Sequence, residues 1–141
     1  MNHRLDIVIL ATVLLFAGCN ETRVTSPKTR RPPADQGEVT IFQAPPREYQ
    51  LLGTVRSDTE VTREKEFTAQ PIIEELRAKS AAMGGNGVLL EVPGAETMKG
   101  VALEGGYYMD KFYRFQIEAG AHPHAFAQAI WVPDKYHRDD W

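Results

Sequence analysis

The sequence has a single cysteine, Cys19, among its 141 residues. One cysteine cannot form an intramolecular disulfide, and it cannot make a thiolate metal site without other ligands. The chain also lacks an excess of positive charge, since 16 Lys and Arg residues stand against 19 Asp and Glu residues. Proteins that bind nucleic acid need a clustered basic face, so we expect no nucleic acid partner.

The first residues contain an apolar run that is too short to cross a bilayer. The segment 7–17 has eleven residues, whereas a transmembrane helix needs roughly 20. It follows Arg4 and ends in small residues before Cys19, which is typical of a signal peptide. A buried core helix is the alternative interpretation, but the run is apolar on every face. We therefore expect residues 1–18 to be a signal peptide that is removed.

The motif Leu15-Phe16-Ala17-Gly18-Cys19 resembles the bacterial lipobox. The resemblance implies a bacterial lipoprotein with lipid attached at Cys19: a diacylglyceryl group on the sulfur and an acyl chain such as palmitate on the new amino terminus. Two or more chains hold a protein stably at a membrane. A free reactive thiol is the alternative for Cys19. Asn20, where Asp would favour inner-membrane retention, implies the outer membrane under the enterobacterial sorting rule.

Residues 19–37 predict a flexible tether after the lipid. The segment is rich in Pro, Thr and basic residues, and Val24 is its only large aliphatic residue. Such a segment cannot bury enough apolar surface to offset the entropy of ordering it. We expect a solvated spacer that reaches roughly 55 Å. The alternative is a basic strand that lies on anionic lipid or threads a partner.

Residues 38–133 have the pattern of one small α+β domain. Five segments of apolar alternation or short apolar runs predict strands: 39–43, 49–55, 88–92, 107–118 and 125–132. The first two are adjacent and predict a hairpin, so we expect a mostly antiparallel sheet of about five strands. Residues 57–66 and 94–106 are expected to be loops, and residues 134–141 a polar tail.

A helix is predicted between the second and third of these strands, from a cap at Thr68 to about residue 83. Pro71 suits its first turn, and the glycines that follow residue 83 suit its end. Glu75 and Lys79 are spaced to form an ion pair along the helix. An apolar stripe at helical spacing is expected to pack on one face of the sheet: Ile72, Ile73, Leu76, Ser80 and Met83.

A series of short motifs follows the same order: Val39-Thr-Ile-Phe, Leu52-Gly-Thr-Val, Leu76-Arg-Ala-Lys-Ser-Ala, Met83-Gly-Gly-Asn-Gly-Val-Leu-Leu and Gln128-Ala-Ile. The series resembles the periplasmic domain of the Rcs envelope-stress sensor lipoprotein and related uncharacterised small α/β lipoproteins, and also a small heavy-metal-binding α/β family. The resemblance implies a non-catalytic envelope interaction or stress-sensing module. The sensor domain carries disulfides that this chain cannot form, so we expect no redox-linked role. We expect Asn86 to bond local backbone in its turn.

No catalytic arrangement emerges from the sequence. The serines of the segment after Cys19 are Ser26, Ser57 and Ser80, and none stands in a Gly-x-Ser-x-Gly turn that would make a nucleophile. The turn at residues 84–87 follows a helix and precedes a strand, which is the reverse of the order that cradles phosphate. The sequence therefore predicts that the chain is not an enzyme, and we expect no cofactor.

Two histidines provide an alternative function. His122-Pro-His124 places two imidazoles close together at a turn, and His137, Asp139 and Asp140 could join them if the tail folds back. Zn²⁺ and Cu²⁺ accept such ligands, so the alternative is a periplasmic metal-binding lipoprotein that uses His122 and His124. The simpler interpretation is an exposed turn and a polar tail without metal.

An aromatic cluster supports the leading function. It comprises Tyr107, Tyr108, Phe112 and Tyr113. Alternation places Tyr108 and Phe112 on the polar side of the predicted strand, and exposed aromatic residues favour a protein-binding patch. We therefore expect an outer-membrane lipoprotein, anchored by lipid, whose domain faces the periplasm and binds another envelope protein.

Overall fold

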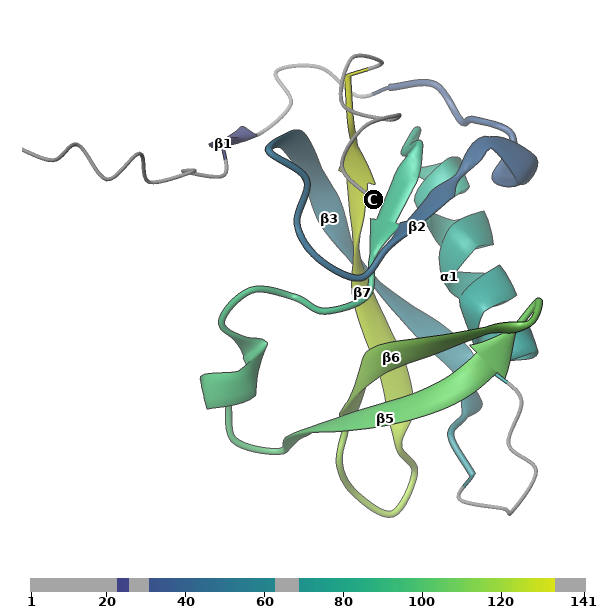
Figure 1. The fold of residues 1–141 in the computed structure, drawn as a ribbon, viewed down its shortest axis with the longest axis vertical. Coiled ribbons are helices and arrows are strands. Elements are labelled where there is room, and N and C mark those ends of the chain that lie inside the picture. The colour runs from purple at the N-terminus through teal and green to yellow at the C-terminus, as the bar shows by residue number, and fades with distance from the viewer. Residues whose placement is uncertain (1–22, 26–30, 63–68, 134–141) are drawn as a thin grey trace, which may run out of the picture.

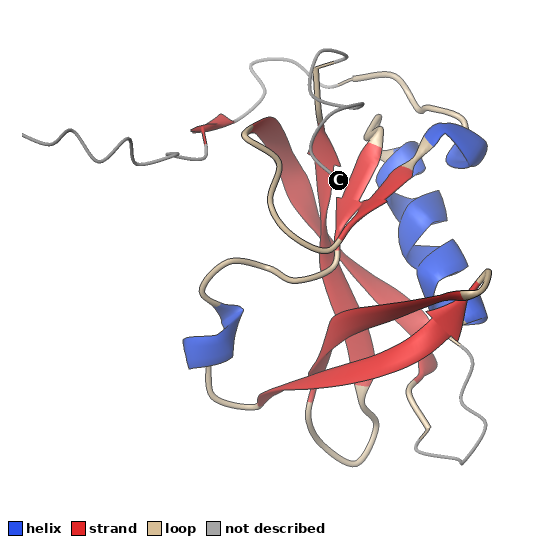
Figure 2. Ribbon diagram, in the orientation of Figure 1, coloured by secondary structure: helices blue, strands red, loops and turns tan. Residues whose placement is uncertain are grey.

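The helix α1 (Gln70–Ala82) lies across one face of a sheet (Figures 1 and 2). This computed structural model describes residues 23–25, 31–62 and 69–133. Pro71 stands in the first turn as expected, while the predicted cap Thr68 lies outside the described residues. Gly84 ends the helix with a φ of 82°, a left-handed conformation that suits glycine. The predicted stripe is confirmed, with Met83 half-buried and the others buried: Ile72, Ile73, Leu76 and Ser80.

The described residues form a mixed sheet of seven strands. Five strands follow one another in the order β1 (Arg23–Thr25), β3 (Glu48–Glu60), β7 (His124–Trp131), β4 (Gly87–Leu89) and β2 (Thr40–Phe42). Two more form a hairpin, β5 (Val101–Tyr108) and β6 (Lys111–Glu118), and β6 also pairs with β7. The predicted α+β domain with one helix on one face of the sheet is confirmed. The sheet has seven strands rather than about five, and two of its pairings, β1 with β3 and β2 with β4, are parallel.

The predicted hairpin of the first two strands is wrong. β2 pairs in parallel with β4, whereas β3 pairs antiparallel with β7, so the connection between β2 and β3 crosses the sheet. The connection contains Pro45 and the buried Pro46. Two consecutive prolines cannot supply the backbone donors and the φ angles of a tight hairpin turn. The chain therefore leaves the sheet at this point instead of turning back on itself.

The second half of the domain also differs from the prediction. The expected loop 94–106 contains a short 3₁₀ helix η2 (Ala95–Thr97) and most of β5. The expected single strand 107–118 is instead the end of β5, a turn and β6. Two features concealed the hairpin: Gly105-Gly106 interrupts the alternation of β5, and the turn lacks the Asn-Gly or Asp-Gly signal of tight hairpins.

Strand β3 continues through residues that were expected to be a loop, because two helix side chains support it. The backbone N–H groups of Asp58 and Thr59 donate to Glu75 at 2.7 and 3.1 Å, and the Thr59 hydroxyl donates to the same carboxylate. Lys79 donates to the carbonyl of Arg56 and pairs with Asp58 at 2.9 Å. The predicted pair between Glu75 and Lys79 is therefore wrong, since both side chains reach across to β3.

Glu75 should make the stability of the domain depend on pH. Burial alone raises the pKa of its carboxyl, but the hydrogen bonds from Thr59 and Asp58 outweigh burial and lower the pKa. Because the pKa is lower in the folded state than in the unfolded chain, the charged carboxyl stabilises the fold. This contribution is lost as the pH falls from the ordinary carboxyl range through the lowered pKa. We expect Glu75→Gln to cost about 1 kcal/mol at pH 7, because bonds to a neutral amide are weaker. The difference from the parent should shrink in urea unfolding at low pH, and a constant difference would contradict this role.

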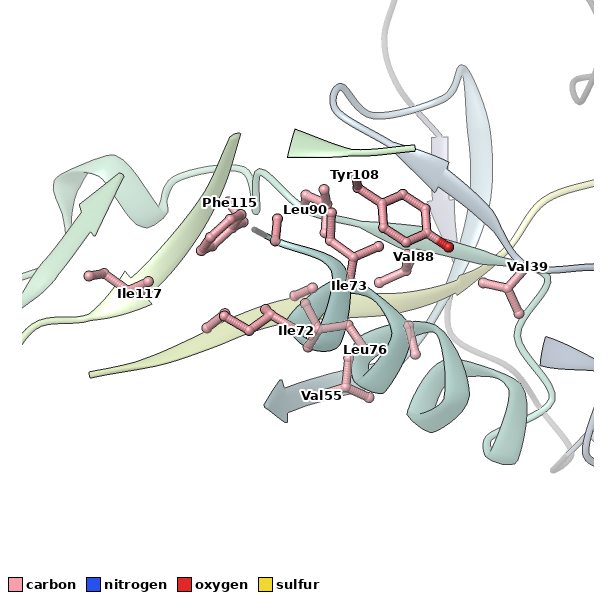
Figure 3. Packing of buried hydrophobic residues seen from close by; sticks show 14 of the residues in the cluster. Val39, Val55, Ile72, Ile73, Leu76, Val88, Leu90, Tyr108, Phe115 and Ile117 are labelled. Atoms are coloured by element: carbon pink, nitrogen blue, oxygen red, sulfur yellow. The ribbon is translucent and has the colours of Figure 1, made fainter. Parts of the chain in front are cut away.

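The buried side chains lie on both faces of the sheet. The larger cluster joins the helix, the inner face of the β5–β6 hairpin and β7, and Figure 3 shows Ile72, Ile73 and Leu76 pointing from α1 toward it. The smaller cluster lies on the opposite face: Phe42, Tyr49, Leu89, Ile130 and Val132. The hairpin is thus part of the core through one face only, which determines what its other face can do.

Three side-chain amides bond to the backbone N–H and C=O of a single distant residue, as a neighbouring strand would. Asn86 bonds Val132 at 2.8 and 2.7 Å, and Gln43 bonds Arg114 at 2.7 and 2.8 Å. Gln116 accepts from Val92 at 2.8 Å and donates to it at 3.4 Å. The predicted local bond of the Asn86 side chain is therefore wrong, because the amide reaches the end of β7.

The segment before β2, which the sequence assigns to the tether, contacts the domain. The Arg31 guanidinium lies 3.7 Å from the ring centre of Trp131 and donates to Gln50. The Arg77 guanidinium of α1 donates to the carbonyls of Gln36 and Val39. Residues 1–22, which include Cys19, lie outside the described residues. No helix among the described residues is long and apolar enough to cross a membrane.

Candidate functional site

The turn of the β5–β6 hairpin holds two residues in an uncommon conformation. Met109 and Asp110 have φ angles of 46° and 66°, and positive φ at both central residues is the geometry of a type I′ turn. Asp tolerates this region, but Met carries a steric cost there. Eight cross-strand pairs hold the turn in place. Met109 is 78% exposed, so the turn projects a large apolar side chain into solvent.

The hairpin has an inner and an outer face. On the inner face, Tyr108 and Phe115 are buried against the core. On the outer face, Leu103, Tyr107 and Phe112 are 48%, 62% and 51% exposed. We call these three side chains together with Met109 the outer hairpin patch. Since isolated exposed apolar residues are ordinary but a gathering of four on one hairpin is not, the patch is a candidate for binding.

The aromatic part of the patch is ordered by its own contacts. The rings of Tyr107 and Phe112 meet edge to face with centroids 5.3 Å apart. The Phe112 ring also lies over Gly105, where a Cβ atom would collide with it. Glycine at this position therefore lets the ring lie along the hairpin. A binding surface that is already ordered loses less side-chain entropy when a partner arrives.

A groove continues from the patch. It has a volume of about 610 Å³ and lies between the hairpin, the β2–β3 connection and the segment after β4. Leu103 belongs to both the groove and the patch, and the buried Gln116 lines the groove where its amide bonds Val92. Pro45 and Pro93 line it as well. The groove and the patch form one continuous, mainly apolar surface.

Charged groups border this surface. Arg114 stands on the outer face between the groove and the aromatic pair, and it contacts Glu91 at 2.8 Å. Lys111 lies over the Tyr113 ring at 5.1 Å. Burial raises the pKa of the Tyr113 phenol, and Tyr108 adds to this while Arg77 opposes it. Lys111 and Tyr113 lie on the inner face with Tyr108. Arg114 and Glu91 therefore supply the polar rim of the outer surface, as protein interfaces have.

The structure brings together part of the predicted aromatic cluster. Phe112 is exposed as predicted, and Tyr107 joins it on the outer face. The prediction for Tyr108 is wrong, because only 6% of this residue is exposed and its hydroxyl accepts a bond from Arg77 at 3.0 Å. Sequence reasoning missed Leu103 and Met109, which it placed in a loop and inside a strand. The alternation of Val101 and Leu103 was the available signal.

The two histidines of the metal hypothesis each contact a residue of β3. Nδ1 of His122 lies 2.8 Å from the Glu60 carboxylate, and Nδ1 of His124 lies 2.9 Å from the Ser57 carbonyl. No group of three or more His, Cys, Asp and Glu residues in the described part of the chain could hold a metal ion. The further ligands proposed from the sequence, His137, Asp139 and Asp140, lie outside the described residues. Metal binding stays a prediction.

The described serines serve the fold. The buried Ser57 hydroxyl donates to the Thr59 carbonyl and accepts from the N–H of Ala125. The buried Ser80 hydroxyl donates to the Gly87 carbonyl at 2.7 Å. Ser26 lies outside the described residues.

Comparisons with family models, with curated proteins and with solved structures find no match for this chain. Its function is therefore argued from its own residues.

Proposed function

We propose that this chain is a lipid-anchored lipoprotein of the bacterial outer membrane that binds another envelope protein and catalyses no reaction. In this proposal residues 1–18 are a signal peptide, Cys19 carries the lipid, and the domain faces the periplasm as an interaction or stress-sensing module. The observation that carries the binding role is the outer hairpin patch, in which Leu103, Tyr107, Met109 and Phe112 are all about half exposed or more.

The composition of the patch is that of a protein interface. Tyr, Phe, Met and Arg are enriched at interfaces, and aromatic residues near the centre supply most of the binding energy. The hairpin presents Tyr107 and Phe112 at that centre, with Arg114 beside them. The inner face fixes the hairpin to the core through Phe115, so the patch has a rigid support. Rigid support and an ordered aromatic pair both favour specific binding.

Site-specific photo-crosslinking in living cells tests the binding role. A photoreactive amino acid is placed at Tyr107, at Phe112 or, as a control, at Thr62, which is also exposed. We expect one and the same envelope protein at the two patch positions and not at the control. Tyr107→Ala and Phe112→Ala should each weaken the purified complex about tenfold or more, because central aromatic residues contribute at least 1–2 kcal/mol. Equal capture at Thr62, or no capture at the patch, would refute the role.

Metabolic labelling tests the anchor separately. Cells that receive a labelled fatty acid should incorporate label into the parent chain and none into Cys19→Ala. The variant should also move from the membrane fraction to the soluble fraction, because the acyl chains supply the membrane affinity. An unlabelled parent chain, or a variant that stays in the membrane fraction, would remove both the lipid and the assigned location.

A further inference from the structure

Strand β5 is an edge of the sheet. Within the described residues it pairs with β6 alone, and Figure 1 shows it on the rim of the domain with β6 between it and β7. It has eight residues, whereas β1 and β2 at the ends of the five-strand path have three each. An edge strand carries a row of N–H and C=O groups that point away from the sheet. The partners of these groups decide whether the edge is closed.

The hydrogen-bond pattern of the hairpin identifies which residues of β5 direct their backbone N–H and C=O groups away from β6. In a two-residue hairpin the pair beside the turn, here Tyr108 and Lys111, exchanges both hydrogen bonds, and the pairs alternate from there. The outward residues of β5 are therefore Val101, Leu103, Gly105 and Tyr107. One hydrogen bond agrees with this assignment, since the Ala69 N–H donates to the Tyr107 carbonyl at 3.0 Å.

Within the part of the chain that the structure describes, the other outward groups of β5 are open. Among the described residues, Val101, Leu103 and Gly105 have no hydrogen-bond partner on this side. The strand has one charged residue, Glu104, on its inner face, but it contains no Pro or Lys and its register with β6 has no bulge, so its edge is only weakly protected. Its outward backbone is flanked on the outer face by the apolar side chains of Val101 and Leu103. Such an edge is suited to pair with another strand.

We propose that β5 pairs antiparallel with β5 of a second copy of this chain, in the register centred on Leu103. This register places Leu103 opposite itself and Val101 opposite Gly105, so all three open residues are bonded on each copy. It also places Ala102 opposite Glu104. Like charges therefore do not face one another, and apolar residues meet across the new pair.

The chain itself excludes the neighbouring registers. Pairing centred on Glu104 or on Gly105 would require the outward carbonyl of Tyr107, which Ala69 already occupies. The register centred on Glu104 would also place Glu104 opposite Glu104 of the second copy, and like charges directly opposite each other are unfavourable. Pairing centred on Ala102 would leave Gly105 without a partner. The register centred on Leu103 is thus the one that satisfies the open groups without using the Tyr107 carbonyl.

The pairing would enlarge the surface of the proposed function. Because the two-fold axis of an antiparallel pair is perpendicular to the sheet, the outer faces of both hairpins lie on the same side. The aromatic pair Tyr107–Phe112 of each copy then flanks a central pair of Leu103 side chains. This inference rests on the proposed function for the use of that surface and for the membrane attachment that concentrates the two copies. A contact of one short strand is weak in dilute solution, and attachment to one membrane raises its effective concentration.

Disulfide trapping in membranes tests the register. Leu103→Cys is introduced into the full chain and oxidised with copper phenanthroline. Cα atoms of residues that face each other across an antiparallel pair lie about 5.5 Å apart, within reach of a disulfide. In Glu104→Cys, the matched control, the two new cysteines are offset by two residues and lie beyond about 7 Å. We expect at least tenfold more dimer for Leu103→Cys than for Glu104→Cys or for the parent chain.

A second variant tests the backbone bonds. Val101→Pro removes an outward N–H at the first residue of β5, where the ladder with β6 does not use it. Added to Leu103→Cys, it should reduce trapping at least threefold, while the thermal unfolding temperature stays near that of the parent. Trapping that is unaffected by Val101→Pro would overturn the proposal. So would equal trapping at Glu104→Cys, a Leu103→Cys chain that stays monomeric, or its attachment to a different protein. If Tyr107 captures a partner while Leu103→Cys stays monomeric, the pairing is wrong and the proposed function stands.

Discussion

Replacing Phe115 with alanine is expected to lower the free energy of unfolding by about 3–5 kcal/mol. Phe115 is fully buried, and Figure 3 shows it beside Ile117 and Leu90 where the hairpin meets the core. Truncation removes most of a large apolar side chain and leaves a cavity that the sheet cannot close. Because the free energy of unfolding of a small domain is only about 5–15 kcal/mol, the variant should be close to unfolding at 37 °C.

Phe112→Ala is the matched control, since it removes the same ring three residues earlier on β6. Phe112 is 51% exposed and contacts Tyr107, so we expect a loss below about 1.5 kcal/mol, the scale of one aromatic pair. Urea unfolding of both variants measures the difference. The two variants also separate stability from binding, because Phe112→Ala should lose the partner while the domain stays folded. Similar losses of stability for both variants would show that the hairpin is not divided into a buried and an exposed face.

The contrast between Tyr108 and Phe112 shows where sequence reasoning succeeded and where it failed. On β6 the alternation was correct: Phe115 and Ile117 are buried and Phe112 is exposed. A two-residue turn places the residues on either side of it on the same face, so the inward positions change from odd numbers on β6 to even numbers on β5. Continuing one alternation through the turn therefore assigned Tyr108 to the wrong face. The turn itself was hidden because Met109 and Asp110 adopt positive φ without a glycine.

Local patterns predicted the elements better than their pairing. The helix was predicted from its apolar stripe and from Gly84, both of which are local signals. The parallel pairing of β2 with β4 depends on contacts between segments about 47 residues apart, as in Thr40 with Gly87, which no local pattern encodes. Glu75 and Lys79 could either pair with each other along the helix or bond to β3. They bond to β3 because that strand offers backbone N–H and C=O groups that would otherwise be unpaired.

The largest effect of a change in a single polar group is expected at Asn86. Its amide donates to the Val132 carbonyl at 2.8 Å and accepts from the Val132 N–H at 2.7 Å, and Val132 is fully buried. In Asn86→Asp, a carboxylate oxygen replaces the donor and faces the carbonyl. An acceptor without a donor costs about 1–3 kcal/mol when buried, and a charge beside it adds to the cost. We expect a loss of about 2–4 kcal/mol at pH 7.

The sign of the pH dependence distinguishes the loss of the bonds to Val132 from a non-specific disturbance of the turn. The Val132 carbonyl disfavours the charged form, so the pKa of the new carboxyl is raised in the folded state above its value in the unfolded chain. The new carboxyl therefore stabilises the fold at low pH, where it is protonated and donates to Val132 in place of the amide. This contribution to the free energy of unfolding is lost as the pH rises. The difference in unfolding free energy between parent and Asn86→Asp should therefore be smaller at pH 4 than at pH 7. Asn86→Ala cannot titrate at this position, so its difference from the parent should be the same at both pH values. If the loss of unfolding free energy in Asn86→Asp were as independent of pH as in Asn86→Ala, the two hydrogen bonds to Val132 would not be the reason that Asn86 holds the end of β7.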